Sequence, residues 1–314
     1  MKSEQLTRLY RQQLQDFELA KKNYTNLEQV IYREIPFRNF PIRLQYNPSR
    51  ILSTNAKIDA QTLATRKCFL CPDYRPEQQK GIPYGKDYHI FVNPYPIFPC
   101  HFTVPSNWHE PQCITGHFST MLDLAIDFPE YIIFYNGPDC GASAPDHFHF
   151  QMAPRGSMPL ETDICCEELC QKVVERDFFS ISMLQNYLRK VIVLQASDAH
   201  LVSVLFQQVL ALIGQVTPYE KEPMINLLCW FDNCQWQVCL FPRQTRRPWQ
   251  FYAEGEEKIL FSPGCVDMAG LIIAPRKEDF EKYSADLLTD LFQQVTISAE
   301  KEERIKIQLQ KITV

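Results

Sequence analysis

The stretch Asn136-Gly-Pro-Asp-Cys-Gly-Ala-Ser-Ala-Pro-Asp-His-Phe-His-Phe-Gln151 decides how this sequence is interpreted, because it joins a glycine-bearing turn and a hydroxyl to alternating imidazoles. Residues two apart on a strand share a face, so His147, His149 and Gln151 are expected to project together, with the intervening phenylalanines facing the opposite layer. One imidazole can then attack phosphorus while its neighbours hold phosphate oxygens. A core strand with two hydrogen-bonded histidines would explain His-x-His alone, but the asparagine, glycine and serine upstream favour a phosphate site.

This stretch resembles the active-site segment of the histidine triad superfamily, in the branch that holds galactose-1-phosphate uridylyltransferases, diadenosine tetraphosphate phosphorylases and GDP-hexose phosphorylases. In that branch an Asn and a Gly-x-Ser turn precede His-x-His-x-Gln, and the six positions are filled here by Asn136, Gly141, Ser143, His147, His149 and Gln151. The resemblance implies that His149 is the nucleophile, that Ser143 and Gln151 contact the phosphate, and that Asn136 and Gly141 belong to the nucleotide site. The hydrolase branch carries a third His in place of Gln151, so transfer is favoured over hydrolysis.

A second stretch, from Tyr88 to Gln112, is similar to the strand, turn and strand of the same superfamily. There an Asn ends the first strand and two histidines stand eight residues apart on the second, and here these are Asn93, His101 and His109. The usual Pro-Gly-His is replaced by Pro-Cys-His at the turn. By resemblance, Asn93 is expected to contact the ribose or base of a nucleotide.

The sequence Cys68-Phe-Leu-Cys71 predicts a metal site, because a C-x-x-C turn lets two thiolates face one ion. Tetrahedral zinc needs two further nitrogen or sulfur ligands, and a C-x-x-C alone is equally compatible with a redox pair. Zinc-bearing members of the superfamily have similar residues at Cys68, Cys71, His109 and His147. The resemblance therefore implies a structural zinc ion on these four ligands, which fixes His147 and so aims His149.

Basic residues in two segments are candidates for phosphate binding. The segment from Leu44 to Lys57 resembles the entry segment of uridylyltransferases, which makes Arg50 and Lys57 candidate phosphate ligands. In the second segment, Arg243 is the first of three arginines, with Arg246 and Arg247, whose guanidinium groups could bind an acceptor phosphate through paired hydrogen bonds. Solvated charges remain the alternative for both segments.

Composition bounds the class of protein. The 314 residues are 45% hydrophobic and carry a formal net charge of −5, so a nucleic-acid partner is not expected. The first residues are polar and no run of eighteen apolar residues follows, which predicts a cytoplasmic protein without a membrane partner. The twelve cysteines are then expected to be reduced thiols.

The order of patterns along the chain predicts an α+β fold of two tandem histidine triad-like halves, each an antiparallel sheet flanked by helices. The strand that ends in Pro-Arg243 matches the triad strand, which ends in Ala-Pro-Arg155, and the later half resembles the second half of diadenosine tetraphosphate phosphorylases. The expected divisions are a helical extension, a catalytic half, a mainly helical connector, a second half without the triad, and a helical tail: 1–39, 40–156, 157–221, 222–276 and 277–314.

Together these features predict a nucleotidyltransferase or phosphorylase. A nucleotide sugar or dinucleoside polyphosphate gives its nucleotidyl group to His149, and phosphate or a sugar phosphate accepts it. Gln151 cannot act as a general acid or base, which argues against the first alternative, a dinucleoside polyphosphate hydrolase. The second alternative is a zinc-stabilised nucleotide-binding protein without catalysis, which an intact set of Ser143, His149 and Gln151 argues against.

Overall fold

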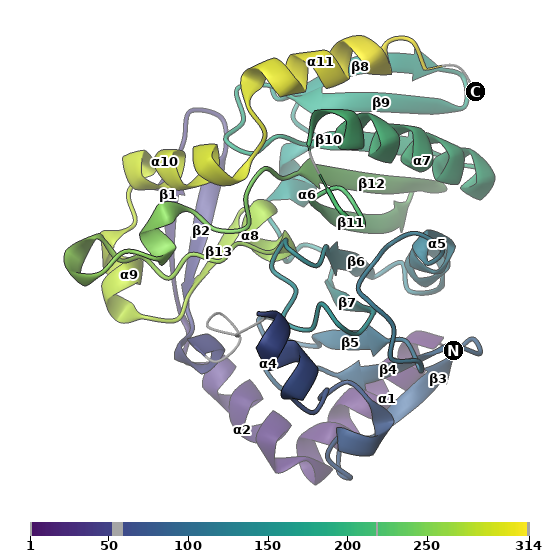
Figure 1. Ribbon diagram of the computed structural model, residues 1–314. Coiled ribbons are helices and arrows are strands. Elements are labelled where there is room, and N and C mark those ends of the chain that lie inside the picture. The colour runs from purple at the N-terminus through teal and green to yellow at the C-terminus, as the bar shows by residue number, and fades with distance from the viewer. Residues whose placement is uncertain (1, 52–58, 218, 313–314) are drawn as a thin grey trace.

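The computed structural model describes residues 2–51, 59–217 and 219–312, and its centre is one antiparallel sheet of ten strands (Figure 1). The strand order is β3-β4-β5-β7-β6-β11-β12-β10-β9-β8. In chain order these strands are β3 Gly81–Tyr84, β4 Tyr88–Val92, β5 Phe102–Pro105, β6 Tyr131–Asn136, β7 His149–Pro154, β8 Cys170–Arg176, β9 Phe179–Leu184, β10 Ile192–Ala196, β11 Ile225–Asp232 and β12 Gln235–Pro242.

The sheet consists of two halves with the same topology, which meet where β6 pairs with β11. Within each half, the outermost three strands follow one another in sequence, and the fifth strand inserts between the third and the fourth. A helix joins the third strand to the fourth in both halves: α5 (Phe118–Asp127) in the first and α7 (Ala199–Val216) in the second. The predicted α+β class with two tandem halves is therefore confirmed in the strand order.

The prediction that residues 157–221 form a mainly helical connector is wrong, because the segment contains three strands of the large sheet. Apart from the short α6 (Leu160–Asp163), this segment forms β8, β9, β10 and α7, which are the first elements of the second half. The second half thus begins near Cys170 rather than at residue 222. The strand signal is weak because β8 is an edge strand with mostly exposed polar side chains, so it lacks the alternation of a half-buried strand.

Helices cover one face of the large sheet, and a second layer covers the other (Figure 1). The first face packs against α1 (Lys2–Asp16), α2 (Glu18–Leu27), α5, α7 and α11 (Ala299–Leu309). The second layer contains a small sheet of β1 (Ile31–Pro36), β2 (Pro41–Tyr46) and β13 (Leu271–Ala274), with α8 (Cys265–Met268), α9 (Lys277–Lys282) and α10 (Ala285–Val295). The predicted helical extension, 1–39, therefore also contains β1.

Helix α7 is long and apolar enough to cross a membrane by length and composition alone. In the fold, however, its apolar residues Val202, Leu205, Phe206, Val209 and Ile213 are buried in the same core as the large sheet. Phe206 stacks on Phe118 of α5, with ring centroids 3.7 Å apart. The hydropathy of α7 is thus explained by its position as a core helix of the second half.

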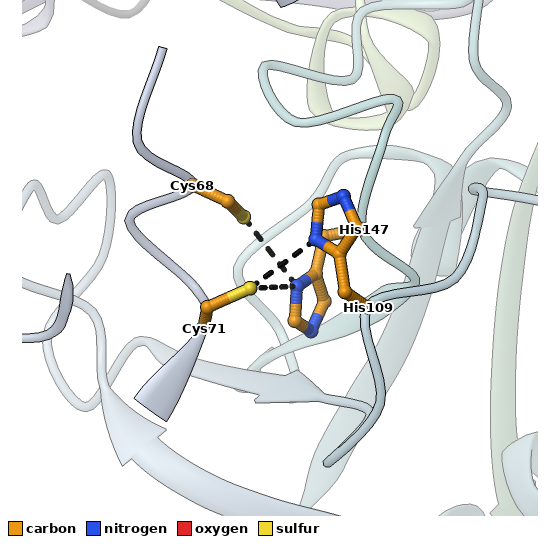
Figure 2. A group of neighbouring side chains, drawn as sticks. All are labelled: Cys68, Cys71, His109 and His147. Carbon is orange, nitrogen blue, oxygen red and sulfur yellow. Dashed lines mark hydrogen bonds between the residues drawn. The ribbon is translucent and has the colours of Figure 1, made fainter. Parts of the chain in front are cut away.

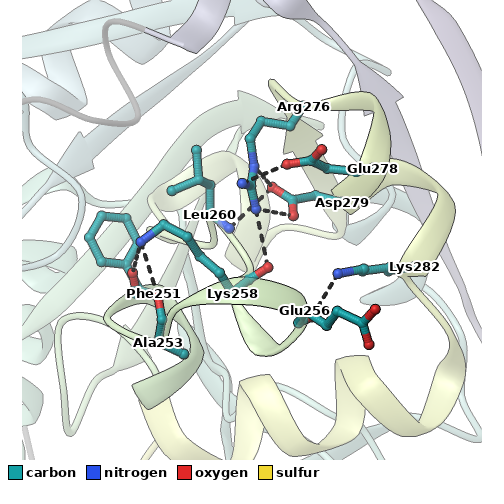
Figure 3. Close-up of polar contacts among 9 residues, drawn as sticks. All are labelled: Phe251, Ala253, Glu256, Lys258, Leu260, Arg276, Glu278, Asp279 and Lys282. Atoms are coloured by element: carbon teal, nitrogen blue, oxygen red, sulfur yellow. Dashed lines mark hydrogen bonds and ion pairs between the residues drawn. The ribbon is translucent and has the colours of Figure 1, made fainter.

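The segment after β12 is held in place by polar contacts from α9 (Figure 3). Arg276 donates to the carbonyl of Lys258 at 3.1 Å and to Asp279, which in turn accepts the backbone N–H of Leu260 at 3.1 Å. Lys282 donates to the carbonyl of Glu256 at 2.6 Å. These contacts hold residues 256–260 against α9 and the arginine that precedes it.

Candidate functional site

A cavity of about 410 Å³ is lined by the triad strand and by residues that follow β12. Its wall includes seven of the residues predicted from the sequence to bind or react with a nucleotide: Arg50, Asn93, Asn136, Gly141, Ser143, His149 and Gln151. Two predicted phosphate ligands differ: Arg243 is not part of the wall, and Lys57 lies outside the described residues. The cavity therefore brings together most of the predicted site.

His149 is the first residue of β7, and hydrogen bonding fixes its tautomer. Its Nδ1 lies 2.9 Å from the carbonyl oxygen of His147, so Nδ1 carries the proton and donates it. Burial lowers the pKa of His149 to about 4, which keeps the ring neutral at physiological pH. Nε2 has no hydrogen-bond partner among the described residues, so its lone pair is available to a ligand in the cavity.

Gln151 is oriented by His101, which precedes β5 and whose Nε2 lies 3.0 Å from Oε1 of Gln151. Nδ1 of His101 accepts the backbone N–H of Ile97, so its proton is on Nε2, and burial lowers its pKa to about 3. A donor at Nε2 selects the oxygen of the amide, which leaves the NH₂ group of Gln151 for a ligand.

Before His101, Cys100 adopts a φ of 52°, the left-handed conformation that favours glycine.

The turn between β6 and β7 contains Gly141, with a φ of +93°. A Cβ at this position would lie 2.5 Å from Cα of Gly264, so only glycine allows the turn to approach the second half this closely. Ser143 follows and lines the cavity with a hydroxyl that has no partner in the described part of the chain. The turn thus presents a free hydroxyl to the cavity that His149 also lines.

Gln112 is a supporting residue that the sequence did not single out for this role. Its buried amide donates to the carbonyls of Asn136 and His149, both at 3.0 Å, and accepts the backbone N–H of His149 at 2.8 Å. It therefore joins the end of β6 to the start of β7. A lone glutamine in a loop gives no sequence signal, because its function depends on the two strands that it bridges.

The predicted role of Arg243 as a phosphate ligand is not supported by its position. Its side chain is fully buried and all five of its N–H groups face protein oxygens. The acceptors are Oδ1 of Asn226 and the carbonyls of Val295, Pro263, Thr245 and Arg246. Its cluster neighbours Arg246 and Arg247 line the cavity instead.

Asn93 and Arg50 lie in the cavity wall with part of their polar groups already engaged. Asn93 donates to the hydroxyl of Thr103 at 3.0 Å and accepts the N–H of Tyr95 at 2.9 Å. Arg50 donates to the carbonyl of Tyr95 at 2.6 Å through Nη1, and burial lowers its pKa to about 10. The remaining guanidinium donors of Arg50 stay available to an anion.

The four predicted metal ligands converge on one point (Figure 2), and their donor atoms all lie within 4.8 Å of one another. Nδ1 of His147 lies 3.4 Å from the sulfur of Cys68, and Nδ1 of His109 lies 3.2 Å from that of Cys71. His147 precedes β7 rather than lying on it, and its Nε2 donates to the carbonyl of Ser106 at 2.9 Å. This second hydrogen bond fixes the ring so that Nδ1 faces the sulfurs, as is usual for metal-ligating histidines.

Comparisons with known proteins agree with this geometry. Residues 9–154 match the family model described as a domain of unknown function, DUF4922, and residues 166–313 match the model described as GDPGP1-like, C-terminal domain. The yeast Ap4A phosphorylase Apa2 in complex with Ap4A superposes with a TM-score of 0.58 at 16% identity, over 92% of this chain and 97% of that chain. The chain therefore shares the fold of this phosphorylase.

A second structure of yeast Apa2 gives a TM-score of 0.58 at 15% identity, over 93% of this chain and 95% of that one. ADP-glucose phosphorylase from Arabidopsis thaliana superposes less well, with a TM-score of 0.40 at 14% identity over 85% of this chain and all of that chain. No curated protein matches the sequence. The chain thus shares the fold of yeast Apa2 at low sequence identity.

Proposed function

We propose that this protein is a nucleotidyltransferase or phosphorylase that works through a nucleotidyl-histidine on His149. One observation carries the proposal: His149 is held as a neutral imidazole whose Nδ1–H is bound by the carbonyl of His147, with Nε2 free in the cavity. A core histidine of purely structural role would use both nitrogens inside the protein. The names of the solved relatives, an Ap4A phosphorylase and an ADP-glucose phosphorylase, are consistent with this class of reaction.

In the first step, Nε2 of His149 attacks the α-phosphorus of a nucleotide donor. A P–N bond forms, and the P–O bond to the leaving group breaks. The leaving group is a sugar phosphate from a nucleotide sugar or a nucleoside polyphosphate from a dinucleoside polyphosphate. The phosphate leaves as a stable anion, so no general acid is required, and Gln151 could not supply one. In the second step, an oxygen of an acceptor phosphate attacks the same phosphorus, and the imidazole leaves with its lone pair restored.

Ser143 and the amide of Gln151 stabilise the charge that builds on the non-bridging oxygens. Both line the cavity together with His149, and the hydrogen bond from His101 to Oε1 of Gln151 leaves the NH₂ group of Gln151 for a ligand. Donors that are already oriented lose little order when the transition state forms, so they favour the transition state over the ground state.

We also propose that the ion held by Cys68, Cys71, His109 and His147 is zinc. Two thiolates and two imidazoles are the donor set that favours tetrahedral zinc, and no fifth His, Cys, Asp or Glu joins the group among the described residues. Burial and the neighbouring thiol of Cys68 raise the pKa of Cys71 to about 11, so a nearby cation is needed for the Cys71 thiol to ionise at neutral pH. The ion is structural and takes no part in the transfer steps.

The experiment is incubation of the protein with a panel of labelled nucleotide sugars and dinucleoside polyphosphates, followed by denaturation. Label that stays on the denatured chain, and that leaves when phosphate or a sugar phosphate is added before denaturation, supports transfer. Release of free nucleotide without an acceptor would favour the hydrolase alternative. Nucleotide binding without retained label or turnover across the whole panel would favour the non-catalytic alternative.

A further inference from the structure

Three arginines in the cavity wall have a buried N–H group without an acceptor. Within the described ranges these are Nε of Arg66, Nη1 of Arg75 and Nε of Arg246. Buried guanidinium donors are almost always paired, because each unpaired group has lost its hydrogen bond to water. Arg66 and Arg75 flank one turn of the first half, Arg246 comes from the second half, and all three line the cavity, so the missing acceptor is expected to lie inside it.

The charge of the wall is also unbalanced. In the part of the chain that the structure describes, five arginines line the cavity, Arg50, Arg66, Arg75, Arg246 and Arg247, against a single lining carboxylate, Asp267. Asp146 pairs with Arg66, which leaves four guanidinium groups that face few protein anions. Burial lowers the pKa of Arg75, Arg246 and Arg247, as expected for cations that lack partners. One phosphate at His149 would leave much of this charge unmatched.

Two of these arginines flank the turn that carries the metal ligands. Arg66 stands two positions before Cys68 and donates through Nη1 to the carbonyl of Ser143 at 3.2 Å. Arg75 follows Cys71 by four positions, and its backbone N–H donates to the carbonyl of Cys71 at 3.2 Å. Arg75 also lies over the ring of Phe91, 4.1 Å from its centroid. A metal that fixes the turn therefore fixes both guanidinium groups.

We infer that Arg66, Arg75 and Arg246 bind phosphate groups beyond the one that His149 attacks, and that the metal positions the first two. The inference rests on the proposed function for the assignment of His149. It adds to that function by naming a phosphate chain as the part of the substrate or acceptor that these arginines recognise. Planar guanidinium groups match this ligand, because each can bind two phosphate oxygens at once. The metal then has a second effect, on affinity, besides fixing His147.

Calorimetric titration with inorganic phosphate and with inorganic tripolyphosphate tests this without any assumption about the base. Wild type should bind tripolyphosphate at least about tenfold more tightly than phosphate, since charged hydrogen bonds are added along the chain. Arg66→Gln, Arg75→Gln and Arg246→Gln should each lose about tenfold in tripolyphosphate affinity and little in phosphate affinity. Arg75→Lys should lose less than Arg75→Gln. The matched control is Arg8→Gln, an exposed residue of α1 outside the cavity, which changes the net charge equally.

Metal dependence separates the two parts of the inference. Cys68→Ser, or wild type treated with a chelator, should lose about as much tripolyphosphate affinity as Arg75→Gln does. Chelation should lower the affinity of Arg75→Gln little further, because the metal acts through Arg75. It should still lower the affinity of Arg246→Gln, in which Arg66 and Arg75 are intact. Circular dichroism and zinc content, measured before and after each titration, show that the chain stays folded. Equal affinity for the two anions, or variants that behave like Arg8→Gln, would overturn the inference. Loss of the His149 adduct with tripolyphosphate binding intact would instead overturn only the proposed function.

Discussion

Nη1 of Arg243 lies 2.7 Å from Oδ1 of Asn226, and this contact orients the residue that joins the second half of the protein to the turn between β6 and β7. The amide nitrogen of Asn226 donates in turn to Oδ1 of Asn136 at 2.8 Å and to the carbonyl of Cys140 at 2.7 Å. Asn136 also accepts the backbone N–H of Cys265 at 2.6 Å. The half without the triad therefore holds the turn that carries Gly141 and Ser143.

Replacement of Arg243 should affect stability rather than ligand affinity. Arg243→Met leaves five protein oxygens without their donor, so we expect the free energy of unfolding to fall by about 3 kcal/mol or more. Arg247→Met is the comparison, because Arg247 lines the cavity and its Nε donates to the hydroxyl of Ser262 at 2.8 Å. Denaturant unfolding and ligand titration separate the two effects. Unchanged stability with weakened phosphate binding in Arg243→Met would restore the role predicted from the sequence.

Metal removal should destabilise the protein. We expect about one zinc per chain after purification without chelators, and Cys68→Ser should lose the zinc and several degrees of melting temperature, because ligand binding to the native state adds to its stability. Cys165→Ser, at an exposed cysteine outside the four-ligand group, is the control. Elemental analysis and thermal melting measure both properties. Protein that contains no zinc, and melts as Cys68→Ser does, would contradict the metal assignment.

The first half should not fold alone. In the full chain β6 pairs with β11, with Tyr135 opposite Leu227, and Trp236 donates to the carbonyl of Leu122 at 3.0 Å. A fragment of residues 1–155 would expose this central strand and its apolar surroundings to solvent. We expect aggregation or a non-cooperative melt in place of a soluble monomer. A compact fragment with a cooperative transition would show that the halves are independent.

The pH profile of adduct formation should reflect the buried state of His149. Burial lowers its pKa to about 4, so the nucleophilic neutral form persists well below pH 6.5. We expect the rate to be level from pH 8 to about 5 and to fall with a midpoint near 4. The unfolded chain takes up a proton near pH 6.5 but the native ring does not, so acid also destabilises the fold between these values. A rate midpoint near 6.5 would indicate an exposed imidazole.

Local motifs and the family resemblance singled out residues that the structure brings together, whereas long-range contacts were predicted poorly. The four candidate metal ligands were implied by the resemblance, the shared face of His149 and Gln151 follows from their spacing on a strand, and the structure brings each set together. Arg243 was misassigned because its acceptors, such as Val295 and Pro263, are distant in sequence. The sequence of an arginine cluster does not show which members line a cavity and which are buried with their N–H groups bound to protein oxygens.

In the second half, too, the sequence predicted only those elements that have a clear local pattern. The hairpin of β11 and β12 follows from alternating residues around a tight turn, in which Asn233 and Cys234 both adopt positive φ. The hairpin of β8 and β9 was missed because β8 lies at the edge of the sheet, where polar side chains protect a strand but hide its period. The equivalence of the halves became visible only from strand order.

The central claim is that His149 carries the nucleotidyl group, and intact mass spectrometry with peptide mapping tests it most directly. Wild type mixed with a reactive donor should gain one nucleotidyl mass on His149, stable to base and labile to acid, as expected of a phosphorus–nitrogen bond on imidazole. His149→Asn should keep nucleotide binding but lose the adduct and turnover, because it retains a polar side chain without a nucleophilic nitrogen. An adduct on another residue, or undiminished turnover in His149→Asn, would contradict the mechanism.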